Sequence, residues 1–334
     1  MKVLVLGYGS IGKRHIRNLL QLGYQNLTVF DPNESSLKEV EGIAPNTDVT
    51  SDYGALLMKS FDVVFVCSPT ALHVKQALDF AERKTHLFIE KPLGDSLEGV
   101  NDLIGTVRKN QLITMIGCNM RFHPAVTFLK EVLHSNILGA LYHFRLEAAS
   151  YLPDWRPGQD YRNNYGAHRD MGGGIILDGI HELDYATWLF GDFRQIECVA
   201  GKLSNLEIDV EDVAEITVQS KSNVIGSIYL SYLDQPYRRG YDISGEKGSL
   251  RWRYENKFVE IFMNGDTAWK KAKEFSDYDA NNSYLDMLKY FFNCLENKRE
   301  TFCNVKFARN VLSAALTARS KAESKEKQLS GSTQ

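Results

Sequence analysis

The chain has 334 residues and a formal net charge of −3, with 43% hydrophobic and 24% charged residues. This length exceeds the usual size of one domain, and the composition is typical of a soluble globular enzyme, so we expect two folded domains. A weakly negative charge balance gives no overall attraction to nucleic acid or to an anionic membrane, so neither is expected as a partner.

The cysteines are far apart in the sequence and form no C-x-x-C pair or zinc-like cluster. They are Cys67, Cys118, Cys198, Cys294 and Cys303. We therefore expect reduced and mostly buried thiols, no bound metal and a cytoplasmic location. The chain begins with a strand-like run that is too short for a signal-peptide core, and no segment is long enough to cross a bilayer.

The beginning of the chain carries the pattern around which the rest is organised. An apolar run, Val3 to Leu6, predicts a buried strand and is followed by a G-x-G-x-x-G sequence. In this spacing the first glycine permits a tight turn, the second lets the backbone approach a pyrophosphate, and the third lets helix and strand pack closely. The helix predicted from Ile11 to Leu22 then directs its N-terminus at the phosphates. We assign these residues to dinucleotide binding: Gly7, Gly9, Ser10, Ile11 and Gly12.

Asp31 follows the second predicted strand, Leu27 to Phe30, and lies nineteen residues after Gly12. An acidic side chain there accepts hydrogen bonds from the adenosine ribose and repels a 2′-phosphate, which favours NAD over NADP. The alternative is that Asp31 only begins a turn with Pro32 and Asn33. The order of strand, glycines, helix and acid favours the cofactor interpretation.

Strands and helices continue to alternate, which predicts a doubly wound parallel sheet. The strand Phe61 to Cys67 ends at Ser68 and Pro69, and His73 begins a helix that runs to about Arg83. Ligands of such sheets bind at the carboxyl ends of strands, so we assign Ser68, Pro69 and His73 to the cofactor cleft. The alternative for His73 is an ordinary place in the first helical turn.

A lysine at the end of the next strand is the first candidate for chemistry. The strand Leu87 to Ile89 runs directly into Glu90, Lys91 and Pro92. Because proline cannot continue a central strand, Lys91 is presented at the carboxyl edge, where the nicotinamide is expected. An exposed lysine is normally a solvated charge, but this placement favours a chemical role.

These motifs together resemble the Gfo/Idh/MocA family, named after glucose-fructose oxidoreductase, inositol dehydrogenase and rhizopine catabolism. The resemblance covers nearly the whole chain. It rests on the glycine fingerprint, Asp31, Ser68-Pro69-Thr70 with His73, Glu90-Lys91-Pro92 and Asn119-Met120-Arg121-Phe122. It implies that Lys91 is the catalytic lysine, that Glu90 belongs to the cofactor site, and that the loop with Asn119 and Arg121 borders the nicotinamide and the substrate. It also implies a homodimer or homotetramer.

We divide the chain into a Rossmann domain (1–121), an α+β substrate-binding and oligomerisation domain (122–320) and a polar tail (321–334). The second domain is expected to contain an open, mainly antiparallel sheet, because short strands follow one another without helices between them. A helix from 305 to 321 is expected to pack back on the first domain, and the last ten residues of the chain are expected to fray.

Asp178 and His181 are three residues apart in a helix predicted from Ile175 to Leu189, so both would project from one helical face. A histidine can carry a proton near neutral pH, and a neighbouring carboxylate can orient its ring. In alcohol oxidation His181 would take the hydroxyl proton while Lys91 stabilises the developing negative charge. The family usually spaces aspartate and histidine by four residues, so the assignment rests more on His181. The alternative is that Asp178 is only a polar position of an amphipathic helix.

Cations and aromatic rings gather between Trp155 and Arg169, just before this helix. Arginine suits carboxylates and phosphates, and aromatic rings suit the apolar faces of sugars, so we expect a sugar, sugar acid or nucleotide-sugar. The assigned substrate-binding residues are Arg121, Arg156, Arg162 and His168. The alternative is that these arginines are ordinary surface or subunit-contact residues.

The sequence therefore predicts an NAD(P)-dependent dehydrogenase that transfers a hydride between a secondary hydroxyl of a sugar-type substrate and nicotinamide. Two alternatives stay open. One is an enzyme whose oxidation is transient, so that the net reaction is an epimerisation, hydrolysis or elimination with recycled NAD. The other is a non-catalytic sensor that holds NAD.

Overall fold

The computed structural model describes residues 1–45, 47–156 and 158–331 and separates into two compact units. Unit 1 comprises Met1–Asn119 and Asn281–Leu312, and unit 2 comprises Met120–Ala280 and Ser313–Gln334. The predicted division differs, because it placed 281–312 in the second domain. Pro157 of the predicted substrate-binding stretch and residues 332–334 of the predicted tail lie outside the described residues.

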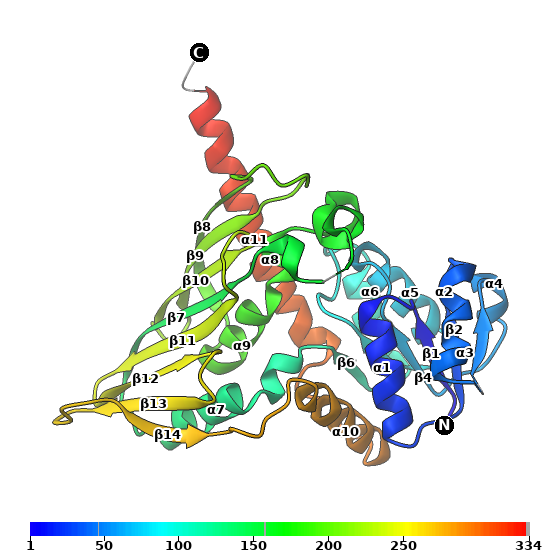
Figure 1. The fold of residues 1–334 in the computed structure, drawn as a ribbon, viewed down its shortest axis with the longest axis horizontal. Helices are drawn as coiled ribbons and strands as arrows, with labels where there is room; N and C mark the ends of the chain where they lie inside the picture. Colours follow the sequence, from blue (N-terminus) through cyan, green and yellow to red (C-terminus); the bar gives the residue numbers. More distant parts are fainter. Residues whose placement is uncertain (46, 157, 332–334) are drawn as a thin grey trace. The chain divides into compact units, whose positions relative to one another are not determined.

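Unit 1 is built on a parallel sheet of six strands in the order β3-β2-β1-β4-β5-β6 (Figure 1). The strands are β1 (Val3–Leu6), β2 (Leu27–Phe30), β3 (Asp48–Thr50), β4 (Val63–Val66), β5 (His86–Ile89) and β6 (Thr114–Ile116). Every residue of β1 and β4 is buried, because both faces of a parallel sheet are covered, and this explains their purely apolar sequences. From β1 the strands are added in one direction as far as β3, and from β4 they are added in the other direction as far as β6. Ligands of such sheets bind at the point between β1 and β4 where this order reverses.

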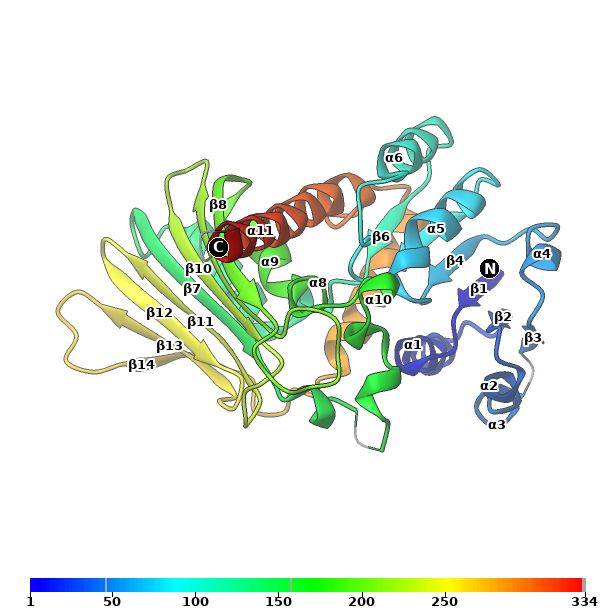
Figure 2. The same cartoon turned by 90° about the horizontal axis from the view of Figure 1, so that it is seen from above.

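Helices cover both faces of this sheet (Figure 2). Helices α5 and α6 pack together on one face, and α1 packs with α10 on the other. The helices of unit 1 are α1 (Ser10–Gln21), α2 (Glu34–Lys38), α3 (Val40–Ile43), α4 (Tyr53–Leu56), α5 (His73–Ala81), α6 (Val100–Lys109) and α10 (Asn282–Glu296). The ring of Tyr24 stacks on Phe292 of α10 at a centroid distance of 3.9 Å, which explains why this late helix belongs to the first unit. The predicted doubly wound parallel sheet is confirmed.

Unit 2 contains a sheet of eight strands in the order β14-β13-β12-β11-β7-β10-β9-β8. They are β7 (Leu141–Ala149), β8 (Phe193–Gly201), β9 (Val213–Ser220), β10 (Ile225–Ser231), β11 (Arg238–Gly245), β12 (Gly248–Arg253), β13 (Phe258–Met263) and β14 (Lys270–Glu274). Neighbouring strands are antiparallel except β7 and β10, which run parallel, so the mainly antiparallel sheet is confirmed. Strand β14 was not predicted, because its sequence lacks alternating apolar residues.

One face of this sheet is buried under helices of unit 2. These helices are α7 (Pro124–Ser135), α8 (Ile175–Asp178) and α9 (Ile180–Phe190), and they lie on the same side of the strands in both views (Figures 1 and 2). Phe144 of β7 stacks on Phe190 of α9 with ring centroids 4.2 Å apart. The opposite face carries exposed apolar side chains, among them Val199 and Ile225.

The last helix, α11 (Val305–Gly331), continues through most of the predicted polar tail. Lys, Glu and Gln are good helix formers and are frequent beyond residue 320, so a polar sequence is compatible with a longer helix. The helix therefore continues past its predicted end at residue 321 as far as Gly331, and the fraying of the last ten residues stays a prediction.

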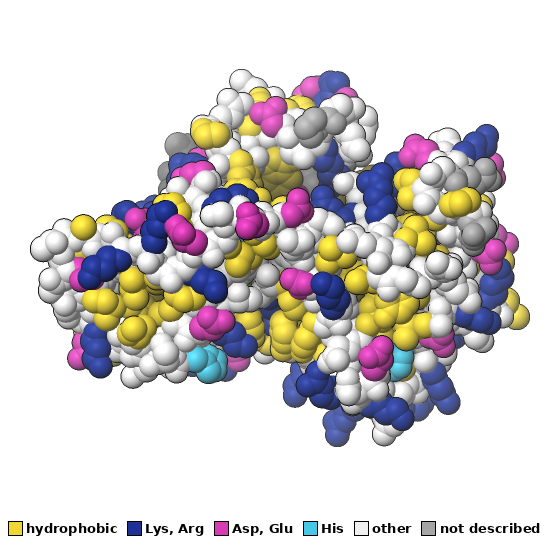
Figure 3. Space-filling model, turned by 60° about the horizontal axis from the view of Figure 1, so that its bottom comes forward, with side chains coloured by type: hydrophobic (Ala, Val, Ile, Leu, Met, Phe, Trp, Pro, Cys, Tyr) yellow, Lys and Arg dark blue, Asp and Glu magenta, His cyan; other side chains and the backbone are white. Residues whose placement is uncertain are grey.

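Charged side chains of both signs lie among apolar ones on the face of the molecule in Figure 3, with lysines and arginines gathered near its lower edge. Among the described residues, no helix combines the length and the apolar character needed to cross a membrane.

His123 is a buried polar side chain of unit 2, with 5% of its surface exposed. Its Nδ1 accepts the backbone N–H of Ala125 at 3.2 Å and so caps α7, while its ring packs on Trp252 at a centroid distance of 4.7 Å. Burial, together with the nearby charges of Arg239 and Lys257, lowers the pKa of His123 from 6.5 to about 3. The folded protein therefore favours the neutral ring.

We expect His123 to make unit 2 sensitive to acid. Its pKa is lower in the folded than in the unfolded chain, so the unfolded chain binds the proton first and stability falls as the pH decreases below about 6.5. His123→Asn keeps an acceptor at the start of α7 but cannot titrate. The free energy of unfolding of this variant, measured by urea denaturation, should fall less steeply with decreasing pH than that of the wild type. The two slopes should differ by up to about 1.4 kcal/mol per pH unit. Identical pH slopes for both proteins would contradict this assignment.

Candidate functional site

The residues predicted to bind a cofactor lie at one edge of the sheet in unit 1. Gly7 follows β1, Asp31 follows β2, Ser68 follows β4, and Glu90 follows β5. Because parallel strands bring their carboxyl ends to the same edge, the topology gathers segments that are distant in the sequence.

The glycine turn between β1 and α1 is sterically restricted to glycine at two positions. Gly7 has φ +97°, and a Cβ added at Gly12 would lie 2.0 Å from the carbonyl oxygen of Gly7. A Cβ added at Gly9 would instead meet nothing within 4 Å among the described residues. Helix α1 begins at Ser10 and Ile11 without a side-chain cap, so the first-turn N–H groups fit an anionic group such as a pyrophosphate.

The carboxylate of Asp31 is held by the backbone. Its Oδ2 accepts the N–H of Tyr8 at 2.8 Å, and its Oδ1 accepts the N–H of Asn33 at 2.9 Å. Asp31 thus begins the turn that the alternative interpretation proposed and also connects that turn to the glycine loop. Each carboxylate oxygen has a further lone pair, so the group fits a role as acceptor for ribose hydroxyls.

His73 joins two loops of this edge. Its Nδ1 lies 2.8 Å from the carbonyl oxygen of Pro92, and its Nε2 lies 2.8 Å from that of Ser68. Burial lowers the pKa of His73, and the hydrogen bonds to the two carbonyls oppose this shift. Because both ring nitrogens face protein atoms, the contacts favour a role in holding the loops after β4 and β5. Pro69 directly follows Ser68 and precedes a short 3-10 helix, Thr70–Leu72.

Lys91 is half-buried at the end of β5, next to the buried Glu90. The Oε2 of Glu90 accepts the backbone N–H of Lys91 at 3.2 Å, and its Oε1 lies 2.6 Å from Nε2 of His15. Nothing in the sequence indicates this contact of His15, because only its position after the glycine turn is recognisable. Asn119 is buried as well, and its Nδ2 donates to Oγ of Ser283 at 3.0 Å.

In unit 2, the single helix predicted from Ile175 to Leu189 is wrong. Helix α8 ends at Asp178, and α9 begins at Ile180. A Cβ at the intervening Gly179 would lie 2.7 Å from the carbonyl oxygen of Ile175, so the chain needs glycine where it changes direction. Asp178 and His181 therefore do not share one face of a continuous helix. Both are buried, and His181 lies in the first turn of α9.

Two tyrosines hold the carboxylate of Asp178. Tyr165 Oη donates to Oδ1 at 2.7 Å, and Tyr232 Oη donates to Oδ2 at 3.2 Å. Burial raises the pKa of Tyr232 well above its ordinary value, and the charge of Asp178 adds to the shift, so this hydroxyl keeps its proton and stays a donor. Sequence reasoning missed both tyrosines, because Tyr232 is 54 residues from Asp178 and neither tyrosine belongs to a recognisable motif.

Arg121 and Arg162, both assigned to substrate binding, are paired with carboxylates of unit 2. Arg121 is 1% exposed and makes two 2.7 Å hydrogen bonds to Asp184 through Nε and Nη2. Arg162 is exposed and pairs with Asp160 at 2.8 Å and with Glu207 at 3.0 Å. These contacts favour structural roles for both guanidinium groups.

The other two assigned residues lie in the irregular stretch before α8. Nη1 of Arg156 donates to Oδ1 of Asn164 at 2.7 Å, and its guanidinium lies 5.6 Å from the ring centroid of Tyr165. His168 places Nε2 2.5 Å from the carbonyl oxygen of Arg162. The structure thus brings Arg156 to the tyrosine that contacts Asp178.

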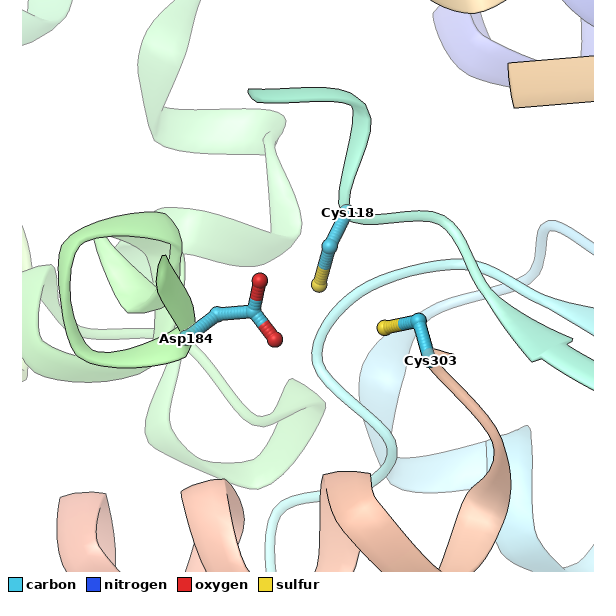
Figure 4. A group of neighbouring side chains, drawn as sticks. All are labelled: Cys118, Asp184 and Cys303. Carbon is cyan, nitrogen blue, oxygen red and sulfur yellow. The ribbon is translucent and has the colours of Figure 1, made fainter. Parts of the chain in front are cut away.

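Two buried cysteines of unit 1 point toward each other in Figure 4. The sulfur atoms of Cys118 and Cys303 lie within 4.8 Å of one another. Asp184, which the figure also labels, belongs to unit 2, and Arg121 occupies both of its oxygens. Two thiols are fewer ligands than the three or four of a typical zinc site, so their proximity alone does not indicate a metal centre.

Comparison with known proteins identifies the family. Residues 1–118 match the model described as an oxidoreductase family with an NAD-binding Rossmann fold, and residues 126–251 match the C-terminal domain of the same family. The chain belongs to the Gfo/Idh/MocA family. The resemblance noted in the sequence is thereby confirmed.

Several relatives of this Gfo/Idh/MocA protein span most of its length. An uncharacterized oxidoreductase of Bacillus subtilis is 26% identical over 90% of this chain and 87% of its own. Myo-inositol 2-dehydrogenase of Thermotoga maritima is 29% identical over 75% of this chain and 74% of its own. Among solved structures, levoglucosan dehydrogenase in complex with NADH and levoglucosan has a TM-score of 0.87 at 18% identity and covers 97% of both chains, which confirms the fold.

We expect Asp31 to contribute to cofactor binding and selectivity. Asp31→Ala removes a charged acceptor, whose hydrogen bonds are worth about 1.5–3 kcal/mol, so Kd for NADH should rise about 10- to 100-fold and the preference over NADPH should shrink. Fluorescence titration with each cofactor measures both effects. Asp62→Asn is the control, because its carboxylate also accepts a backbone N–H, that of Lys2, but precedes β4. Equal affinities of wild type and Asp31→Ala for NADH would contradict the assignment.

Proposed function

We propose that this protein is an NAD-dependent dehydrogenase that transfers a hydride between a secondary hydroxyl carbon of a sugar or cyclitol and the nicotinamide. The observation that carries the proposal is the set of groups at the carboxyl edge of the sheet in unit 1. A glycine-restricted turn, an uncapped helix N-terminus, the backbone-held Asp31 and the half-buried Lys91 all belong to that edge. The names of the myo-inositol and levoglucosan relatives support the substrate class.

The protein groups have separate tasks in this reaction. Bound NAD would supply the hydride acceptor. The N–H groups of the first turn of α1 hold the pyrophosphate, and Asp31 orients the adenosine ribose. Lys91 stabilises the negative charge that develops on the substrate oxygen, and His181 takes the hydroxyl proton. Asp178 is fixed by Tyr165 and Tyr232, so we propose that it orients groups of the substrate-binding unit instead of acting through a shared helix face with His181.

We propose an anionic or hydroxyl-rich substrate with Arg156 as its binding residue in unit 2. Among the described residues, no carboxylate pairs with Arg156, and its guanidinium lies over the ring of Tyr165. A cation beside an aromatic ring suits a sugar that carries a carboxylate or phosphate.

We also propose that the protein is a cytoplasmic homodimer or homotetramer that associates through the open face of the sheet in unit 2. Val199 is 68% exposed and Ile225 is 49% exposed on this face, between charged neighbours, which fits a contact surface that becomes covered. The five free and buried cysteines fit a reducing compartment. Light scattering at micromolar concentration measures the mass, and a monomer that persists would contradict the assembly.

The reaction is tested by screening sugars, cyclitols and sugar acids for the absorbance change of reduced nicotinamide, with NAD and NADP supplied separately. Lys91→Ala should lower kcat at least about 100-fold because it removes a group that stabilises transition-state charge, while Kd for NADH stays within about twofold. A sensor would respond to ligand equally with either residue. A product without net reduction of NAD would instead indicate transient oxidation.

A further inference from the structure

We propose that His15 and Glu90 form a buried pair that positions Lys91 relative to the phosphate-binding helix α1. The proposal deepens the proposed function and rests on it, because it concerns the lysine assigned to that reaction. Neither side chain needs to contact the substrate for this role, so both are positioning residues.

The pair joins two elements that are distant in the sequence. His15 projects from α1, and Glu90 directly follows β5, 75 residues later. The distance from His15 Nε2 to Glu90 Oε1 is 2.6 Å, and the two residues are 0% and 5% exposed. This distance is that of a hydrogen bond, and a hydrogen bond that a carboxylate accepts is stronger than one between neutral groups.

The surroundings indicate which atom carries the proton. Nδ1 of His15 is buried and has no hydrogen-bond partner among the described residues. A proton on Nδ1 would leave a buried donor unsatisfied, whereas a bare nitrogen lone pair costs less. The proton therefore lies on Nε2, which donates to the carboxylate of Glu90.

Aromatic rings fix the imidazole in place. The ring centroid of His15 lies 5.4 Å from that of Phe65, 5.0 Å from that of Phe88 and 6.3 Å from that of Tyr284. These rings exclude water and leave the imidazole little freedom to change its rotamer. His15 is thus a rigid donor, not a mobile surface group.

The carboxylate of Glu90 is confined from the other side as well. A Cβ added at Gly117 would lie 2.5 Å from Glu90 Oε1, so only glycine leaves room for the carboxylate. The second oxygen, Oε2, accepts the backbone N–H of Lys91 at 3.2 Å. His73 binds the carbonyl oxygen of the following Pro92 at 2.8 Å. The backbone that bears Lys91 is therefore held on both sides.

These contacts form one continuous chain of supports. Helix α1 presents its N-terminus to the pyrophosphate and, on its buried side, holds Glu90 through His15. Glu90 in turn holds the backbone of Lys91. The same helix therefore carries the N–H groups proposed to bind the phosphates and, through His15 and Glu90, holds the backbone that bears Lys91.

The test compares two substitutions of His15 with a matched control. His15→Leu fills a similar volume with an apolar side chain but removes the N–H donor. His15→Gln keeps an N–H donor at nearly the same distance from the backbone. Asn18→Leu is the control, because Asn18 is a buried polar residue of the same helix whose hydrogen bonds go to Asn281 and not to Glu90.

His15→Leu is expected to lower kcat about 10- to 100-fold with Kd for NADH within about twofold, since a displaced catalytic group slows the chemical step and not binding. His15→Gln should recover most of the lost rate. The second readout is the labelling of Lys91 by acetic anhydride relative to the exposed Lys59, quantified by peptide mass spectrometry. The ratio should rise in His15→Leu, because the backbone that bears Lys91 is no longer held and its side chain becomes more accessible, and return in His15→Gln.

The results separate positioning from a general loss of stability. Asn18→Leu should lower the melting temperature but leave kcat and the labelling ratio near their wild-type values. The proposal is overturned if His15→Leu leaves both readouts unchanged or if Asn18→Leu changes them equally.

If His15→Leu does not fold, Glu90→Gln replaces it, because it keeps the shape of the side chain and removes its charge. If the wild type oxidises no substrate, the proposed function fails, while the labelling ratio still decides whether the pair positions Lys91.

Discussion

The close approach of helix α1 to the end of β1 is the constraint on which the cofactor-site edge of unit 1 depends. Gly12 lies so near the carbonyl oxygen of Gly7 that any side chain would separate helix and strand. This approach determines the direction of the helix, and with it the orientation of its first N–H groups toward the edge of the sheet. It also determines that His15, in the second turn of the helix, reaches the aromatic rings of Phe65 in β4 and Phe88 in β5. The steric restriction at Gly7 and Gly12 thus influences the position of Glu90, which follows β5 and contacts His15.

Much of unit 1 was predictable from the sequence, because its signals are local. Apolar runs such as Val63 to Val66 indicate strands covered on both faces, and the glycine spacing indicates the turn and the helix that follows. Asp31 was predictable for the same reason, since it directly follows a strand. The contacts that hold these groups were not predictable: neither the bond from Tyr8 to Asp31 nor the pair of His15 and Glu90 leaves a pattern in the sequence, because each depends on tertiary packing.

Unit 2 was predicted less completely, and the errors have physical causes. Apolar residues continue with helical spacing across Gly179, so periodicity alone did not reveal that the close approach of Ile175 interrupts the helix there. Residues 281–312 were assigned to the second domain, whereas they belong to unit 1. Their position in the sequence does not reveal that Tyr24 stacks on Phe292. The bonds from Tyr165 and Tyr232 to Asp178 were not predictable, because they depend on tertiary packing, although Tyr165 lies in the stretch of cations and aromatic rings before α8.

The composition of strand β14 has a consequence for how the sheet of unit 2 ends. Its lysines Lys270, Lys271 and Lys273 are exposed on the outermost strand, where unpaired backbone groups would otherwise invite a strand from another molecule. Two of these ammonium groups pair with Asp266 and Glu274, so an approaching strand would have to displace hydrated charged side chains before its first backbone hydrogen bond could form. The charged edge strand therefore opposes edge-to-edge aggregation, to which open sheets are prone.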